Sequence, residues 1–488
     1  MTAAETHADA RHEHHERRWI ALAVLLIAGF MNLIDVTIVN VALPSLQAGL
    51  GASSSQIEWV VAAYLMAFAV GLLPLGRLGD MLGRRRIFLL GVGAFTLAST
   101  LCGLAPSIET LIAARFAQGV GGAMMTPQTL AIAQVIFPPR ERAAAFALFG
   151  VTSGLAAVLG PLIGGLLINA DLMGLGWRPI FLVNIPVGLF AVLAGLKFIP
   201  VMKGNADVGI DIGGILLAAL TLLLVVFPLI EGRELGWPGW SFAMLAAAVP
   251  AAWAFARWQA RQADAGRPQL LPVALMTNVN YMVGTLVTSL FFSSVPGFFL
   301  VLAVFLQTGY GLTPLQSGLA TVPFSLGVFV ASMISGKLAQ RWQRPRIFLG
   351  SVMLAGAMVW IKLVLAGLGE TLDTALLLPP LLLAGLGLGT AVSPLFQLAL
   401  ASVPDRDAGS ASGGVQSFQQ VGGSLGVAVM GHLFFSSLMR AQGAGLAPDP
   451  WPGALDIALT YPVFAYALTA LAVLCLQPPA GTDKARAP

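Results

Sequence analysis

Long apolar segments follow one another along almost the whole chain and limit its fold more than any other feature. Each is about 20 residues long, which is enough to cross a bilayer as a helix. Only 10% of the 488 residues are charged, whereas soluble domains average about 25%. The sequence therefore predicts an all-α integral membrane protein. We expect about fourteen transmembrane helices, at roughly 19–43, 56–76, 86–105, 108–136, 142–168, 178–200, 210–230, 238–260, 277–306, 315–339, 346–367, 373–399, 408–436 and 455–477.

The positions of the basic residues predict how these helices are oriented. With the N-terminus in the cytoplasm, 21 of the 26 Lys and Arg residues fall in predicted cytoplasmic segments. Counting one helix too many or too few would move many of these residues to predicted outer segments. We therefore expect a plasma (inner) membrane protein with both termini in the cytoplasm. The polar tails at 1–18 and 478–488 would then be cytoplasmic, and the first is expected to be disordered.

An internal repeat predicts how the helices are grouped. Residues 76–89 (GRLGDMLGRRRIFL) and 336–349 (GKLAQRWQRPRIFL) share seven of fourteen positions, and each copy follows the second helix of a six-helix block. We expect two six-helix bundles, 19–200 and 277–477, separated by an inserted helix pair and cytoplasmic linker at 201–276. Secondary transporters often place their binding site between two such repeats.

The sequence offers little that could hold a metal or a cofactor. Its two cysteines, Cys102 and Cys475, lie far apart in apolar segments without CxxC spacing, so we expect neither a disulfide nor a zinc site. The absence of a P-loop pattern argues against direct ATP drive. We expect no enzyme activity, no cofactor, no metal and no nucleic-acid partner.

Two charges lie deep in apolar segments, Asp35 in the first and Arg115 in the fourth. A carboxylate at the centre of a membrane helix costs about 2.5–3.5 kcal/mol on insertion scales, and such charges usually mark ion pathways. Along the helix axis, Asp35 lies ~13 Å before Pro44, which should end the first helix near the outside. Arg115 lies ~12 Å after Ser107, which should begin the fourth helix near the outside. We expect the two at similar depth. Arg115 would either hold a proton-carrying Asp35 ionised or form a static ion pair with it.

Several motifs follow one another in a recognisable order. The first helix carries the sequence DVTIVNVALP at 35–44, and the fourth carries RFAQGVG at 115–121. The loop after the second helix and the fifth helix each carry glycines at fixed spacing. The loop residues are Gly76, Asp80, Gly83, Arg84 and Arg85, and those of the fifth helix are Gly154, Gly160, Pro161, Gly164 and Gly165. In these motifs the chain resembles the major facilitator superfamily, and in particular its fourteen-helix drug:proton antiporters, the multidrug efflux pumps.

The resemblance covers nearly the whole chain and implies a mechanism. In this family the loop locks the cytoplasmic side closed in the outward-facing state, and the motif in the fifth helix is typical of antiporters. Without the resemblance, a positive-inside anchor would explain the arginines of the loop, and a packing face would explain the glycines of the fifth helix. The second repeat has Gln340 where Asp80 stands, so we do not expect it to lock in the same way.

Some of the remaining residues have a structural explanation, and others fit a structural and a functional explanation equally well. A motif from Trp177 to Pro186 resembles a signature of the same branch, and Trp177 and Arg178 suit an interfacial anchor. His432 is expected to be structural. Polar and aromatic residues in four helices are candidate substrate contacts, and interhelical hydrogen bonds explain any one of them equally well. These candidates are Asn32, Asn40, Gln118, Ser393, Phe396, Gln397, Gln416, Phe418 and Gln420.

The resemblance implies export of amphipathic, cationic or aromatic small molecules in exchange for protons, with Asp35 carrying the proton and two bundles rocking by alternating access. Three alternatives stay open: a dedicated exporter of one endogenous product, a proton-coupled uptake symporter and a non-transporting membrane sensor. The expected partners are the substrate, protons and the lipid bilayer. In a cell with two membranes, a periplasmic adaptor and an outer-membrane channel would join them.

Overall fold

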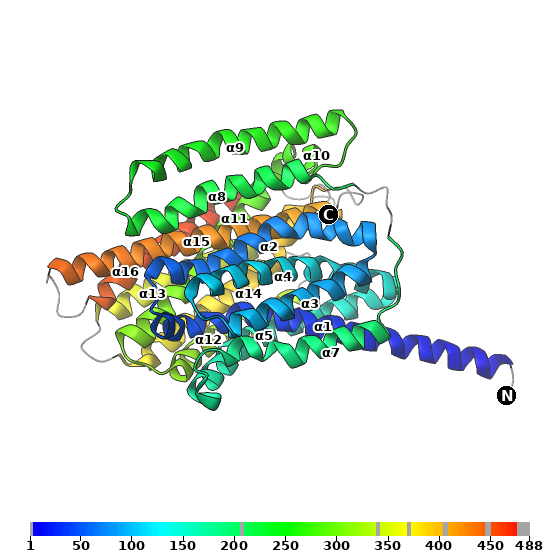
Figure 1. Ribbon diagram of the computed structural model, residues 1–488, viewed down its shortest axis with the longest axis horizontal. Coiled ribbons are helices and arrows are strands. Elements are labelled where there is room, and N and C mark those ends of the chain that lie inside the picture. Colours follow the sequence, from blue (N-terminus) through cyan, green and yellow to red (C-terminus); the bar gives the residue numbers. More distant parts are fainter. Residues whose placement is uncertain are drawn as a thin grey trace, which may run out of the picture.

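The computed structural model describes residues 3–204, 209–337, 342–367, 372–403, 408–444 and 450–475. Within these ranges the protein is helical and contains no strand. Twelve of the described helices are long and apolar enough to cross a membrane. The long helices run roughly parallel to one another, and α1 projects beyond the rest at its N-terminal end (Figure 1).

We call α1–α7 the first helix set. Its members are α1 (Ala3–Leu50), α2 (Ser54–Leu82), α3 (Arg84–Gly103), α4 (Ile108–Ile136), α5 (Pro139–Asn169), the short α6 (Pro179–Leu182) and α7 (Asn184–Phe198). Within it, α4 packs between α2 and α3, and α1 packs against α5 and α7.

The second helix set is α10–α16. It consists of the short α10 (Val273–Met276), α11 (Val279–Val304), α12 (Pro314–Lys337), α13 (Gln343–Ala366), α14 (Leu378–Leu400), α15 (Ala408–Ala444) and α16 (Trp451–Cys475). Here α14 packs against α12 and α13, and α11 packs against α15. The two sets meet where α2 contacts α15 and where α5 contacts α12.

Two helices connect the sets in sequence and form the inserted pair, α8 (Ile212–Glu234) and α9 (Gly239–Asp264). They pack on each other, and α8 also contacts α2 and α15. Figure 1 shows α9 as the outermost helix on one side of the molecule.

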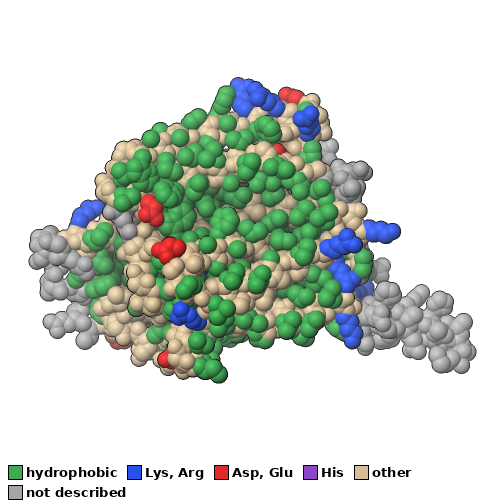
Figure 2. Space-filling model, in the orientation of Figure 1, with side chains coloured by type: hydrophobic (Ala, Val, Ile, Leu, Met, Phe, Trp, Pro, Cys, Tyr) green, Lys and Arg blue, Asp and Glu red, His purple; other side chains and the backbone are tan. Residues whose placement is uncertain are grey.

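The two ends of the molecule differ in charge. We call the end that holds the starts of α2, α4 and α12 the predicted outer end, and the opposite end the predicted cytoplasmic end. Hydrophobic side chains cover most of the face shown in Figure 2, and most of its visible Lys and Arg side chains lie toward the end from which α1 projects. That end is the predicted cytoplasmic one, as the positive-inside pattern requires.

Local sequence explains where the helices at the outer end begin. Ser53 caps α2 by accepting a hydrogen bond from the Gln56 backbone N–H, and the Gln56 side chain accepts one from the Ser53 N–H. Ser107 and Thr110 form the same reciprocal cap on α4. These capping boxes fix the starts of the two helices side by side.

Two predictions about the first helix are wrong. Residues before Arg18, expected to be disordered, continue α1 back to Ala3. Their Ala, Glu and Arg content favours helix, and elongating an existing helix is easier than starting one. Pro44 does not end α1, which continues to Leu50. Neighbouring helices and local adjustment make proline tolerable inside membrane helices.

Candidate functional site

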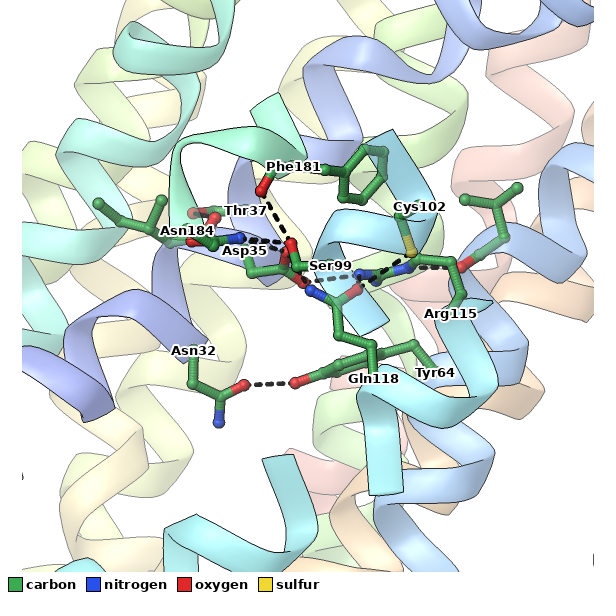
Figure 3. A network of polar contacts seen from close by, with 12 residues as sticks. Asn32, Asp35, Thr37, Tyr64, Ser99, Cys102, Arg115, Gln118, Phe181 and Asn184 are labelled. Atoms are coloured by element: carbon green, nitrogen blue, oxygen red, sulfur yellow. Dashed lines mark hydrogen bonds and ion pairs between the residues drawn. The ribbon is translucent and has the colours of Figure 1, made fainter. Parts of the chain in front are cut away.

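Asp35 and Arg115 meet in the interior of the first helix set. Arg115 Nη1 donates to Asp35 Oδ2 at 2.6 Å, and Asp35 is 0% and Arg115 2% exposed. The other carboxylate oxygen, Oδ1, accepts from Gln118 Nε2 at 2.7 Å and from Asn184 Nδ2 at 3.2 Å (Figure 3). Three donors, one of them the Arg115 cation, thus surround the carboxylate.

The surrounding helices hold these groups in place. Arg115 Nη1 also donates to Gln118 Oε1 at 2.7 Å, and its Nε donates to the Val60 carbonyl of α2 at 3.1 Å. The guanidinium lies over the Tyr64 ring, 4.4 Å from its centroid. One arginine therefore ties α1, α2 and α4 together through an ion pair, hydrogen bonds and a cation–π contact.

Asn184 is a member of this network that the sequence did not reveal. Its amide donates to Asp35 and, at 2.9 Å, to Ser99 Oγ, while Ser99 donates to the Phe181 carbonyl. The only signal was its place in the motif from Trp177 to Pro186, which suggested structural anchoring. Trp177 itself is 3% exposed and packs inside the protein, so it does not face lipid as an interfacial anchor would.

A cavity of about 180 Å³ lies beside the network and between the two helix sets. Arg115 lines it, as do Thr37 and Asn40 of α1 and Tyr64 of α2. The second set contributes mainly apolar and hydroxyl side chains. These include Val295, Pro296, Phe299, Ser317, Thr321, Phe324 and Ser325. A ligand in this cavity would touch the cation that pairs with Asp35.

The glycines of the fifth-helix motif lie at close helix contacts. A Cβ on Gly160 would overlap the Thr37 side chain, and one on Gly164 would lie 2.7 Å from Ile38 Cγ1. A Cβ on Gly165 would lie 2.7 Å from Leu315 Cα in α12. Pro161 lines the cavity. Gly154 lies in the described backbone of α5. The motif thus packs α5 against α1 on one side and against the second helix set on the other.

The loop motif joins α2 to α3 at the predicted cytoplasmic end. Gly83 makes the turn with φ +100°, which favours glycine. Arg84 Nε pairs with Asp80 Oδ1 at 2.9 Å, and its Nη1 donates to the Ala131 carbonyl of α4 at 3.2 Å. Arg85 donates to the Leu196 carbonyl of α7. These contacts all lie within the first helix set.

Further contacts surround the loop motif. The backbone at Gly76 accepts a hydrogen bond from the Gln128 amide at 3.3 Å, which adds a second tie to α4. In the second repeat, Gln340 lies outside the described residues. Arg346, the counterpart of Arg86, donates to the Ser335 carbonyl at 2.9 Å.

The candidate substrate contacts fall in different places. Asn40 lines the cavity. Asn32 accepts from the Tyr64 hydroxyl and donates to Thr126 Oγ1 at 3.1 Å, while Gln118 is part of the Asp35 network. The six candidates on α14 and α15 are not among the residues that line this cavity. They are Ser393, Phe396, Gln397, Gln416, Phe418 and Gln420.

Hydrogen bonds account for part of the α14 group. Gln397 Nε2 donates to Ser393 Oγ at 3.0 Å, and its Oε1 accepts from Gln343 Nε2 at the same distance. Phe396 packs against Phe292, with their ring centroids 6.0 Å apart. These contacts connect α14 to α13 and α11.

Comparison with known proteins identifies the family of the chain. A family model described as Major Facilitator Superfamily matches residues 25–427. The chain belongs to the major facilitator superfamily. A solved structure of this superfamily's fold, the xylose transporter XylE from E. coli in a partially occluded inward-open conformation, superposes with a TM-score of 0.66. It covers 95% of this chain and 99% of its own, at 12% identity, and so supports the fold alone.

The curated relatives within this superfamily are antibiotic and multidrug exporters. A probable actinorhodin transporter of Streptomyces coelicolor is 41% identical over 89% of this chain and 75% of its own length. The tetracenomycin C resistance and export protein of Streptomyces glaucescens is 34% identical over 96% and 84%. The puromycin resistance protein of Streptomyces alboniger is 38% identical over 85% and 81%. The fold and the relatives are those of transporters.

Proposed function

We propose that the protein exports amphipathic, antibiotic-like small molecules in exchange for protons by alternating access. One observation carries the proposal: a fully buried carboxylate, Asp35, is paired with a cation that also lines the cavity between the helix sets. Intramembrane charges are usually functional. A static ion pair would not need the guanidinium to face a cavity.

The geometry suggests how exchange would work. While Asp35 is ionised, its charge is neutralised by Arg115, and the cavity can accept substrate. When Asp35 takes up a proton from outside, the ion pair weakens and Arg115 changes the electrostatics of the cavity wall. Substrate and proton would then compete although they bind at different groups, the substrate in the cavity beside Arg115 and the proton on Asp35. The proton gradient would drive export, and neither a cofactor nor enzyme chemistry is required.

The proposal includes an architecture. The polar side chains of α4, including Arg115 and Gln118, lower its hydropathy, and α5 is 31 residues long. We propose that both cross the membrane, which raises the twelve spans to fourteen. The bundles would be 19–200 and 277–477, with 201–276 inserted and both termini in the cytoplasm of the plasma membrane. The loop at 76–86 would act as the cytoplasmic latch.

A dedicated exporter of one antibiotic is the second candidate. The observation that favours it is the naming of several relatives after single compounds, actinorhodin and tetracenomycin C among them. This candidate shares the proton chemistry and differs in substrate range. A narrow profile across a chemically diverse panel would favour it over a multidrug pump.

The test is substrate-driven proton release from energised inside-out vesicles loaded with a pH-sensitive dye. The panel would contain cationic dyes, biocides and antibiotics. We expect wild type to release protons when a substrate is added and Asp35→Asn to release none. Glu109→Gln, an exposed carboxylate change at the start of α4, is the matched control and should behave as wild type. Equal responses from wild type and Asp35→Asn would contradict the role of Asp35.

A further inference from the structure

A second carboxylate, Glu58, is completely buried in a membrane-spanning helix. It is 0% exposed and lies in the first turns of α2, near the predicted outer end. A carboxyl group kept inside a membrane-spanning segment is usually functional and often part of a proton pathway. The mechanism proposed above does not use Glu58, and its sequence context, at the edge of an apolar segment, does not single it out.

Helix α15 presents a glycine, and so no side chain, at the point where the Glu58 carboxylate packs against it. A Cβ on Gly431 of α15 would overlap the Glu58 carboxyl group. Glycine at 431 is therefore what allows the acid to enter the contact between α2 and α15. The next residue of α15 is His432, a second residue of a type that can bind a proton. This contact is one of those that join the two helix sets.

The inserted pair covers the same place. Trp237, between α8 and α9, meets the His432 ring edge to face, with centroids 5.3 Å apart. Trp59, adjacent to Glu58, donates from Nε1 to Glu231 Oε1 of α8 at 2.8 Å. A small apolar cluster of α2, α8 and α15 lies beside these contacts. Its buried members are Ala62, Val226, Ile230 and Ala428.

Other titratable and charged groups lie on the helices around Glu58. The Val60 carbonyl, two residues further along α2, accepts the hydrogen bond from Arg115 Nε, and two residues rise ~3 Å along a helix. Titratable and charged groups are present in this half on every helix that packs there against α2. They are Asp35 on α1, Cys102 on α3, Glu109 and Arg115 on α4, Glu231 on α8 and His432 on α15.

We propose that Glu58 is a second proton-binding site of the transport cycle, set between the helix sets at the predicted outer end and covered by the inserted pair. A proton from the outer water adds to the carboxylate and makes it neutral, and the same proton leaves when α2 and α15 rearrange. The site gives the inserted pair a role beyond packing. The inference rests on the proposed antiport, because only a proton-driven cycle needs such a site.

The first experiment reads proton binding without transport. Infrared difference spectra of the purified protein between mildly alkaline and mildly acidic buffer report the C=O stretch of carboxyl groups that take up protons. We expect a band in wild type that is missing in Glu58→Gln. Trp59→Phe, which removes the bond to Glu231 and keeps Glu58, should retain the band. A spectrum of Glu58→Gln identical to that of wild type would overturn the proposal.

The second experiment measures the ratio of protons to substrate in proteoliposomes, with ethidium as the probe. We expect Glu58→Gln to lower the ratio by about one proton and to flatten the dependence of transport on outer pH. Gly431→Ala, which displaces the carboxylate and keeps it in the chain, should have a similar effect. Thermal unfolding of each variant serves as the folding control.

The two readouts separate failure of this inference from failure of the proposed antiport. Loss of the band with an unchanged proton ratio would contradict a part for Glu58 in transport. If wild type itself moves no protons with any substrate, the antiport proposal fails. The infrared band would then show only whether Glu58 binds a proton, and the inferred role in transport would fall with the antiport.

Discussion

The two helix sets differ in the kind of polar group that they bury. The buried polar residues of the first set include charged and amide side chains, among them Asp35, Glu58, Arg115, Gln118 and Asn184. Those of the second set, as far as the structure describes it, are hydroxyls apart from Arg346 near the predicted cytoplasmic end. Examples are Thr285, Thr288, Ser293, Ser294, Thr321 and Ser424. The two helix sets of this protein thus bury different chemistry.

This difference suggests a division of labour. Buried charges respond strongly to protons and to the removal of a partner, whereas hydroxyls bonded to their own helix respond weakly. Thr288 Oγ1, for instance, donates to the Gly284 carbonyl of its own turn at 2.8 Å. The first set would then sense protons, and the second would form a neutral wall against which the first set moves.

Removing a buried charge from the first set should have the largest effect. Arg115→Ala leaves Asp35 buried without its cation, so we expect a loss of about 3–5 kcal/mol in the free energy of unfolding. Thr288→Val in the second set should lose about 1 kcal/mol or less. Denaturant unfolding of the purified variants measures both. Similar losses would remove the contrast between the sets.

Crowding the contact between the sets should have the next largest effect. A side chain at Gly165 meets the backbone of Leu315 and Pro314, which cannot turn aside as a rotamer can. We expect Gly165→Val to cost about 1–3 kcal/mol and to open the predicted outer end. Labelling of single cysteines with a membrane-impermeant reagent would detect the opening. Gly29→Ala in α1, where a Cβ meets no atom within 4 Å, is the control.

Asp211 tests the attachment of the inserted pair, which belongs to neither set. Its carboxylate accepts hydrogen bonds from Trp258 at 2.7 Å and Gln259 at 2.6 Å, and from the N–H groups of Gly214 and Leu270 at 2.8 and 3.1 Å. Burial alone would raise the pKa of Asp211, but these four hydrogen bonds outweigh it and place the pKa below its ordinary value.

The lowered pKa of Asp211 determines how its contribution to stability depends on pH. A lowered pKa means that Asp211 stabilises the fold above the ordinary Asp value of about 3.9 and that this stabilisation is lost as the pH falls through the folded-state value. We expect Asp211→Asn to cost about 1–3 kcal/mol near neutral pH and much less in strong acid. Unfolding measured across that range would show the two curves converge. Parallel curves would mean that the hydrogen bonds do not depend on the charge.

The loop motif should show the smallest effect on stability. The Arg84 and Asp80 side chains are 31% and 43% exposed, and exposed ion pairs contribute about 0–1 kcal/mol. We therefore expect Asp80→Asn to leave unfolding nearly unchanged and to slow transport by weakening the latch. Initial export rates set against unfolding midpoints would separate the two effects. A large loss of stability with a normal rate would make the loop a structural anchor.

The sequence predicts the fold and the central pair because both depend on position along single helices. Apolar length gives the spans, and distances from Pro44 and Ser107 place Asp35 and Arg115 at one depth, where the structure pairs them. That estimate succeeds although α1 continues beyond Pro44. Depth in the membrane is set by the apolar segment and does not require the exact end of the helix.

Lateral contacts could not be predicted in the same way. Asn184 reaches Asp35 across 149 residues of chain, and Gly431 faces Glu58 on a helix of the other set. Amides spaced along α14 and α15 look like a substrate wall in sequence, but only the rotation and packing of a helix decide which side chains face a cavity. A pattern within one segment contains no information about the face that a distant segment will cover.

The most direct test of the account is to separate exchange from coupling in one variant. Proteoliposomes containing wild type or Asp35→Asn would be assayed for ethidium counterflow without a gradient and for uphill ethidium transport driven by a pH gradient. The account predicts that Asp35→Asn, which mimics the protonated carboxyl, needs a higher ethidium concentration for counterflow and shows no gradient-driven accumulation at any concentration. Uphill transport by Asp35→Asn at the wild-type level would contradict the central claim that the proton is carried by Asp35.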